Sequence, residues 1–342
     1  MSFLNRLTGF FYKDLAMDLG TANTLIYLKG EGVVLNEPSV VALNRNSGRV
    51  IAVGSEAKEY LGRTPQKIVA VRPMKDGVIA DFEVTRVMIK YFLNKVHRRT
   101  RLFRPRLIVA VPTGITQVEK RAVIESAEQA GARQVHLIEE PMAAAIGAGL
   151  PINKPMGHMV VDIGGGTTEV AVISLSAVAY AESVRVAGDE ANEAIMRYIQ
   201  QHYQIAVGEN EAERIKMEIG SACPLPEPMT IETAGKEILT GVPRAFKVND
   251  QEIRQALKEP VNVIVESVKR AFEKTPPELA TDISDNGVWL AGGGALLKGL
   301  DVLLSDILLL RVQVEGDPLT TVARGAGEVM ESIRDYRQVF LN

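Results

Sequence analysis

The stretch Val160–Val172, VVDIGGGTTEVAV, interrupts an apolar strand pattern with an acid and three consecutive glycines. Ala16–Leu28, AMDLGTANTLIYL, repeats the order of strand, acid, polar turn and strand near the start of the chain. Glycine lets backbone adopt positive φ and approach a ligand closely, and successive N–H groups in such a turn form a concave anion site. An acid fits beside an anion if it holds a hydrated Mg²⁺, because that ion bridges carboxylates to phosphates. The pair of stretches therefore predicts two phosphate loops, with two ordinary β-hairpins as the alternative.

The two stretches align with Asp18 over Asp162, which indicates an internal duplication. Each half continues with strands and then alternating helices and strands, so the pattern predicts a mixed sheet covered by helices, an α/β fold class. The expected helices include Phe82–Val96, Gln117–Ala130 and Leu296–Leu304.

Length and composition restrict the class of protein. A chain of 342 residues suggests two domains, and 46% hydrophobic residues allow a sizeable core. The net charge of −3 argues against a general nucleic-acid binder. A single cysteine fits a reducing compartment, and the first residues lack the apolar stretch of a signal peptide. We therefore expect a cytoplasmic globular protein.

Two further motifs could bind a nucleotide. The glycine turn Gly292–Gly294 follows an expected strand and would let a nucleotide lie against backbone, although many strand–helix connections use glycine. Glu139 and Glu140 end another strand directly before Pro141, which suits a first helical turn. Their carboxylates could simply favour the helix dipole, or one could orient a water for attack on a γ-phosphate. Neither a GxxxxGK[ST] loop nor a GxGxxG after a strand is present, so a P-loop or Rossmann site is not supported.

Four segments match, in order, the signatures of the actin, sugar kinase and Hsp70 ATPase superfamily: Asp18–Thr24, Glu140–Ala145, Asp162–Thr168 and Gly292–Leu296. From about residue 14 to about residue 330 the chain resembles the bacterial actins of rod-shaped cells. The resemblance implies an actin-like, ribonuclease H-like fold, in which two duplicated domains flank a central nucleotide cleft and each carries a smaller inserted subdomain. Domain I would comprise residues 1–145 with 318–342 and an insertion at about 33–75. Domain II would comprise residues 146–317 with an insertion at about 186–250.

The resemblance also implies a role for individual residues at an ATP site. The first phosphate loop would be Gly20, Thr21, Ala22 and Asn23, and the second Gly164, Gly165 and Gly166. The adenosine would be contacted by Glu213, Arg214, Lys216, Gly292, Gly293, Gly294, Ala295 and Leu296. Asp18 and Asp162 would hold Mg²⁺ through water, while Glu140 and Thr167 would position the attacking water. Neither phosphate loop contains Lys or Arg, and an arginine finger can be worth about 10³–10⁵ in rate, so hydrolysis should be slow.

Two segments could contact a membrane. On a helical wheel, one face of the N-terminal segment gathers Phe3, Leu4, Leu7, Phe10 and Phe11, as in helices that lie in the headgroup layer. The alternative is a frayed terminus or a lead-in that packs on the core. Leu102 and Phe103 stand among arginines, which anionic lipid attracts, although a solvated basic loop or an RNA contact has the same composition.

The expected function is an ATP-hydrolysing cytoskeletal protein that forms filaments at the inner face of the cytoplasmic membrane and directs cell-wall synthesis and rod shape. The partners implied are further copies of the chain and, by family resemblance, the elongation proteins RodZ, MreC, MreD and RodA, with no nucleic acid. A small-molecule kinase of the same superfamily and a chaperone-like binding module are the alternatives. Ser305–Val314 departs from the family pattern and leaves the local turn open.

Overall fold

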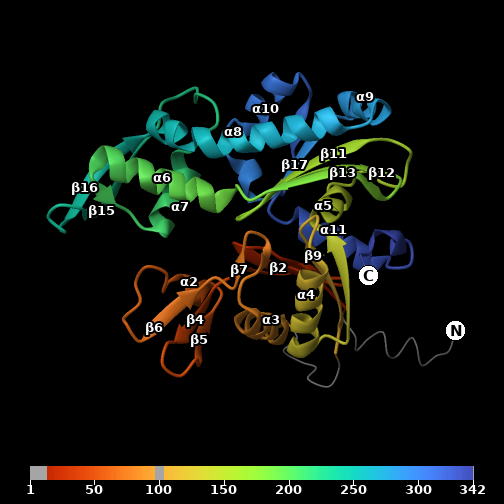
Figure 1. The fold of residues 1–342 in the computed structure, drawn as a ribbon, viewed down its shortest axis with the longest axis horizontal. Coiled ribbons are helices and arrows are strands. Elements are labelled where there is room, and N and C mark those ends of the chain that lie inside the picture. The colour runs from red at the N-terminus through yellow and green to blue at the C-terminus, as the bar shows by residue number, and fades with distance from the viewer. Residues whose placement is uncertain (1–13, 97–103, 342) are drawn as a thin grey trace.

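The computed structural model describes residues 14–96 and 104–341. It contains two five-stranded sheets, one above the other in Figure 1. The sheet of the lower lobe has the order β10-β9-β1-β2-β3, with β1 Leu15–Leu19, β2 Asn23–Leu28, β3 Gly32–Pro38, β9 Arg106–Val111 and β10 Gln134–Glu139. The sheet of the upper lobe has the order β13-β12-β11-β17-β18, with β11 His158–Ile163, β12 Thr168–Ser174, β13 Ala177–Val184, β17 Val288–Ala291 and β18 Val312–Val314.

The two sheets share one plan. In each, three antiparallel strands come first in the chain. A fourth strand then joins the first of them in parallel, and a fifth joins the fourth in parallel. In the central strand β11 every residue is buried, as the apolar run predicts. The expected duplication and the actin-like α/β fold class are confirmed.

Helices cover the outer faces of both sheets (Figure 1). The lower lobe has α3 Phe82–Val96 and α4 Gln117–Ala130, both at their expected bounds. A capping box between Thr116 and Glu119 fixes the start of α4. The upper lobe has α6 Gly188–Tyr203, α7 Glu209–Ile219, α8 Asp250–Lys274, α9 Pro277–Asn286 and α10 Leu300–Leu308.

Each lobe also carries a small sheet on the left of Figure 1. In the lower lobe it consists of β4 Val41–Asn44, β5 Val50–Val53 and β6 Ile68–Val71, with the short helix α2 Ser55–Lys58. In the upper lobe it consists of β14 Ile205–Ala206, β15 Thr230–Glu237 and β16 Pro243–Asn249. The hairpin of β7 Met74–Lys75 and β8 Val78–Ile79 returns the chain toward α3.

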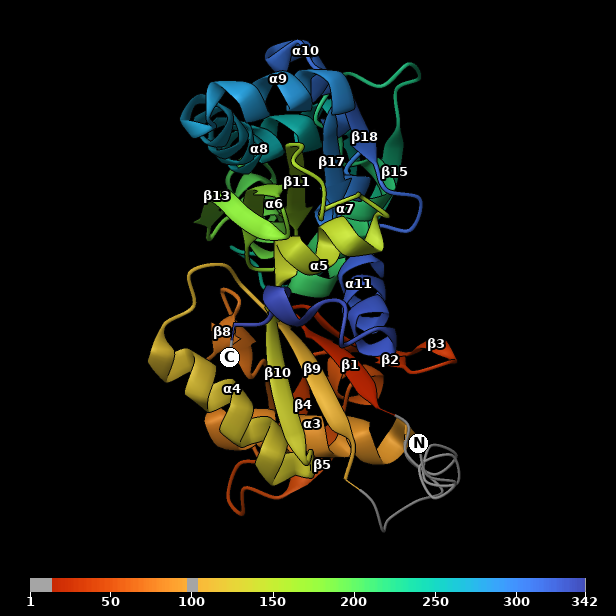
Figure 2. The same cartoon turned by 90° about the vertical axis from the view of Figure 1, so that its right-hand side faces the viewer.

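Two helices lie between the lobes, α5 Glu140–Gly147 and α11 Thr321–Glu331 (Figure 2). Their backbones touch where both are glycine: a Cβ on Gly147 would stand 2.0 Å from the carbonyl oxygen of Thr321, and one on Gly325 would stand 1.8 Å from that of Ala143. The core around them takes residues from both large sheets. This pair of helices is therefore the packed joint between the lobes.

The structure corrects the expected helix at Leu296–Leu304. The glycine turn continues as a 3₁₀ turn, Gly293–Leu296, and α10 begins only at Leu300. Gly299 has a left-handed φ of 73°, so a continuous helix cannot pass through it. Strand β16 and helix α9 were not expected from the sequence. In the unusual Ser305–Val314 segment, Leu309 ends α10 with a φ of 56°, and the Ser305 hydroxyl donates to the carbonyl of Leu310.

Candidate functional site

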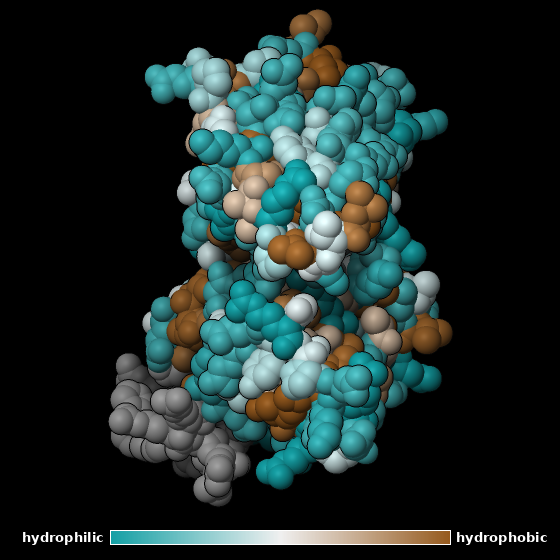
Figure 3. Space-filling view, turned by 90° about the vertical axis from the view of Figure 1, so that its left-hand side faces the viewer, coloured by the Kyte–Doolittle hydropathy of each residue, from teal (hydrophilic) through white to brown (hydrophobic). Residues whose placement is uncertain are grey.

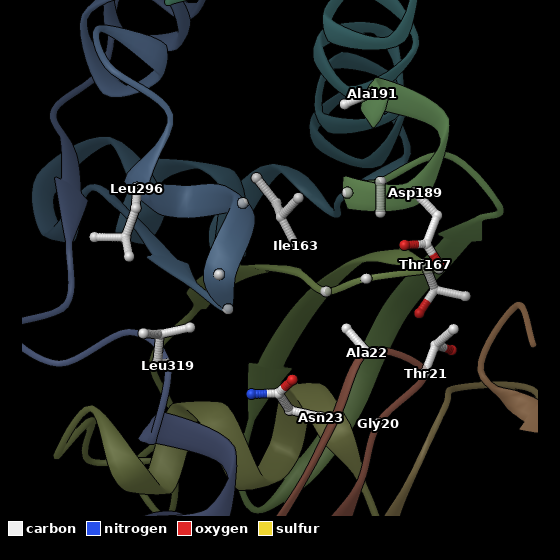
Figure 4. A pocket seen from close by; sticks show the side chains of 18 of the residues that line it. Gly20, Thr21, Ala22, Asn23, Ile163, Thr167, Asp189, Ala191, Leu296 and Leu319 are labelled. Atoms are coloured by element: carbon white, nitrogen blue, oxygen red, sulfur yellow. The ribbon is translucent and has the colours of Figure 1, made fainter. Parts of the chain in front are cut away.

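A cavity of about 580 Å³ lies between the two lobes. Among its lining residues are most of those predicted from the sequence: Asp18, Gly20, Thr21, Ala22, Asn23, Glu140, Asp162, Gly164, Gly165, Gly166, Thr167, Glu213, Lys216, Gly292, Gly293, Gly294 and Leu296. Figure 4 shows the turn after β1 and the turn after β11 converging on this space, with the glycine turn after β17 at its other end. Residues as far apart in the chain as Asp18 and Val322 thus line one cavity.

The two loops leave no room for side chains where they meet. A Cβ on Gly165 would lie 2.6 Å from the Cβ of Ala22, and one on Gly166 would lie 2.9 Å from the hydroxyl of Thr21. Real Cβ atoms do not approach so closely, so glycine is required at both positions. The Thr21 hydroxyl also accepts a hydrogen bond from the backbone N–H of Gly77, at 3.0 Å. The loops therefore offer backbone N–H groups to a ligand at close range, as an anion site needs.

Asp18 and Asp162 occupy equivalent places near the ends of β1 and β11. Burial raises the pKa of each carboxyl to about 7, and the charge of Asp18 adds to the effect on Asp162. Burial disfavours the charged form of both acids. A cation bound between them would stabilise the carboxylates, so the pair suits a cation site. Within residues 14–96 and 104–341 no cluster of three or more His, Cys, Asp or Glu could hold a metal directly. The donor set accordingly fits an ion bound through water, the mode of Mg²⁺.

Glu140 starts α5 at the cavity wall and is 8% exposed. Burial raises its pKa well above the ordinary value, and the charges of Glu169, Asp18 and Asp162 raise it further. Thr167, 7% exposed, also lines the cavity. The two residues that the family resemblance pairs thus line the same cavity.

Glu169 is a buried acid that the sequence reasoning missed. Its carboxylate accepts hydrogen bonds of 2.8 Å from the backbone N–H of Thr113 in the lower lobe and from the hydroxyl of Ser183 in the upper lobe. Burial raises its pKa to about 7. Glu169 lies directly opposite Asp162 in the antiparallel pair of β11 and β12. The hairpin expected from the sequence could have indicated this pairing.

Asp189 and Lys58 also line the cavity without having been predicted. Burial raises the pKa of Asp189 to about 6 against the opposing charge of Arg72. Lys58 comes from α2, in the lobe opposite the predicted adenosine residues.

Helix α7 brings Glu213 and Lys216 to the cavity as expected. Lys216 is largely buried, which lowers its pKa, and its ammonium donates to the carbonyl of Gly188 at 2.8 Å. Arg214 does not line the cavity: its guanidinium pairs with Glu211 at 2.5 Å and Glu218 at 2.8 Å within α7. Successive helical residues point about 100° apart, so Arg214 cannot share the direction of Glu213.

Ala295 does not line the cavity either. It is 3% exposed and packs in the core of the upper lobe beneath the glycine turn.

The candidate membrane residues lie outside the described residues: Phe3, Leu4, Leu7, Phe10, Phe11, Leu102 and Phe103. In the described ranges no helix combines the length and apolar character needed to cross a bilayer. The chain that follows residues 1–13 and the chain that follows residues 97–103 lie side by side. Arg106 donates from its backbone N–H to the carboxylate of Asp14 at 3.1 Å, and Leu15 pairs with Leu107 in parallel register.

Comparison with known proteins agrees with this geometry. The family described as MreB/Mbl protein matches residues 12–338. The cell shape-determining protein MreB of Escherichia coli K12 is 56% identical over 335 residues, 96% of each chain. The cell shape-determining protein Mbl of Bacillus subtilis 168 is 49% identical over 94% of this chain and 97% of its own length.

Among solved structures, MreB5 of Spiroplasma citri bound to AMPPNP superposes with a TM-score of 0.91 at 36% identity, over 96% of this chain and 98% of that one. The same protein has also been solved bound to ADP. The MamK double helical filament has a TM-score of 0.82 at 22% identity, which supports the fold alone. The chain therefore belongs to the MreB/Mbl protein family.

Proposed function

We propose that this chain is a bacterial actin that binds ATP, hydrolyses it slowly and assembles into membrane-associated filaments that direct cell-wall synthesis and rod shape. The observation that carries the proposal is the pair of glycine loops, one from each lobe, that meet across one cavity. Its family membership supports the same conclusion, since relatives are named as cell shape-determining proteins and one has been solved with AMPPNP and with ADP. The lower lobe corresponds to the proposed domain I and the upper lobe to domain II.

The phosphates would lie between the two loops, held by the backbone N–H groups of residues 20–23 and 164–166. Asp18 and Asp162 would hold a hydrated Mg²⁺ beside them. The phosphates and the buried carboxylates are both negatively charged, and the ion would offset the repulsion between them. This arrangement accounts for loops without Lys or Arg.

Glu140 and Thr167 are the residues we assign to hydrolysis. Both are nearly buried, so each offers a fixed hydrogen-bond partner to a water at the cavity wall. Such positioning acts mainly in the transition state. With no basic residue in either phosphate loop the rate should be low, which suits a polymer switch.

The adenosine would lie toward α7 and the glycine turn, near Glu213, Lys216 and Leu296. Apolar side chains of α8 and of the segment after the glycine turn also line this end: Leu257, Val261, Ile264, Leu297 and Leu300. They suit a planar apolar base.

Membrane attachment is supported by the closeness of the points where the two candidate segments join the fold. β1 and β9 are parallel neighbours, so residues 1–13 and 97–103 join the described fold at the same end of these two strands. Burying one Phe or Leu is worth about 1.5–3 kcal/mol, so a single copy would bind weakly. A filament that presents many copies would bind stably through effective concentration. RodZ, MreC, MreD and RodA are partners to test on such filaments.

The test is electron microscopy and ATP turnover of the purified protein with Mg·ATP, with and without anionic liposomes. Filaments that require nucleotide and coat the liposomes support the proposal. Turnover that rises with added small-molecule hydroxyl acceptors, in protein that forms no filaments, would instead favour a kinase.

A further inference from the structure

Two ion pairs join the lower lobe to helix α7 of the upper lobe. The ammonium of Lys58, at the end of α2, lies 2.6 Å from the carboxylate of Glu213 in α7. The guanidinium of Arg72, just after β6, lies 2.5 Å from the carboxylate of Glu209 in the same helix. The partners are 155 and 137 residues apart in the chain, so both contacts depend on how the lobes meet.

The two acids form one face of α7. Glu209 and Glu213 are four residues apart, a spacing that places side chains one above the other. Arg214, the next residue, forms its ion pairs with Glu211 and Glu218 of the same helix. The face of α7 that carries Glu209 and Glu213 is therefore the one turned to the lower lobe.

These pairs lie far from the joint between the lobes. In Figure 1 the joint, α5 and α11, lies right of centre, whereas α7 and the small sheet of the lower lobe lie at the left. Figure 3, viewed from that left side, shows two lobes separated by a waist, with hydrophilic and hydrophobic residues on both sides of it. A contact far from a joint moves most when the lobes open, so these pairs must break for the cavity to open at this side.

Lys58 and Glu213 also line the cavity itself. The predicted adenosine residues all belong to the upper lobe, so Lys58 is a cation that the lower lobe adds at this end. Any nucleotide that leaves past α7 has to pass between these two side chains.

We propose that Lys58–Glu213 and Arg72–Glu209 form a latch that closes the cavity over bound nucleotide and sets the rate of its release. The inference rests on the proposed nucleotide site and adds a gate contributed by both lobes. The side chains are 22–39% exposed, and partly exposed pairs are each worth about two- to fivefold in an equilibrium constant. Losing both pairs should therefore speed release by about four- to twenty-fivefold.

The test is a double-mutant cycle on nucleotide release. The full-length protein is loaded with a fluorescent ATP analogue in Mg²⁺, at concentrations where it stays monomeric, and chased with excess ATP. Arg72→Ala and Glu209→Ala should each release the analogue about two- to fivefold faster, and the double variant no faster than the faster of the two single variants, because both changes break the same ion pair. Lys58→Ala combined with Arg72→Ala should show the product of the two single effects. Arg197→Ala, which removes an exposed pair within α6, is the matched control and should release at the wild-type rate.

Wild-type release should also speed up as salt rises, and the salt effect should shrink in Lys58→Ala/Arg72→Ala, because screening acts on the pairs. Glu209→Gln, which keeps the side-chain size, replaces Glu209→Ala if that variant does not fold. Two results would contradict the latch while leaving the nucleotide site intact. One is release at the wild-type rate in every variant, and the other is a double variant of Arg72 and Glu209 whose release rate shows the full product of the two single effects. A wild-type protein that does not bind the analogue overturns the proposed function as well.

Discussion

Gly325→Ala tests the joint between the lobes. In an ordinary helix alanine is favoured over glycine by about 1 kcal/mol, so helix propensity alone predicts stabilisation. Here the new Cβ would stand 1.8 Å from the carbonyl oxygen of Ala143 and 2.7 Å from the backbone nitrogen of Gly147. Overpacking costs about 1–3 kcal/mol, and these neighbours are backbone atoms of α5 that cannot change rotamer. The upper part of that range should apply, which leaves a net loss of about 1–2 kcal/mol in the free energy of unfolding.

The measurement is denaturant unfolding of the nucleotide-free protein, compared at equal m-values. Gly316→Ala is the matched control, because its Cβ would meet nothing within 4 Å. That change should be neutral or stabilise by about 0.4–1 kcal/mol. If Gly325→Ala is as stable as the wild type, the lobes do not meet through this backbone contact and the joint has been placed wrongly.

Three further perturbations address the metal, the buried acids and the membrane. Asp162→Ala should weaken Mg²⁺-dependent ATP binding while leaving the fold intact, and an unchanged Mg²⁺ titration would exclude the role. Burial raises the pKa of Asp18 and Asp162 from 3.8 to about 7, so the folded ligand-free protein holds protons that the unfolded chain releases. Its stability should therefore fall as pH rises from about 4 to about 7. A melting temperature that rises over this pH range would contradict the burial of the two acids. Deleting residues 1–11 and replacing Leu102 and Phe103 with Ser should abolish cosedimentation with anionic liposomes but not ATP-dependent assembly, and filaments of that variant that still coat liposomes would remove both segments as anchors.

Local signals in the sequence predicted the duplicated sheets and the two phosphate loops, whereas the family resemblance supplied the roles of the other predicted cavity residues. The prediction for helix α4 matches its observed bounds, and a capping box at Thr116 fixes the start of the helix. The phosphate loops were predicted because their glycines and acids are contiguous. These features depend on residues within a few positions of one another, which a single sequence displays.

The errors arose where tertiary contacts decide the outcome. The helix expected at Leu296–Leu304 failed because Gly299, read as part of a helical run, adopts a left-handed φ. Arg214 was assigned to the nucleotide with its neighbours, yet helical geometry turns it toward Glu211 and Glu218.

The cross-lobe contacts of Lys58 and Glu169 were invisible for a different reason. Their partners lie 155 and 56 residues away. Pairings at such separations follow from the approach of two lobes, which no local pattern records.

The central claim is that the cavity binds ATP and that Glu140 positions the water that attacks it. The most direct measurement is ATP affinity and ATP turnover of Glu140→Ala beside the wild type, with filaments followed by electron microscopy. The variant should bind ATP nearly as well, hydrolyse it roughly 10²-fold or more slowly, and form filaments that persist longer. Turnover at the wild-type rate, with ATP bound normally, would contradict the account.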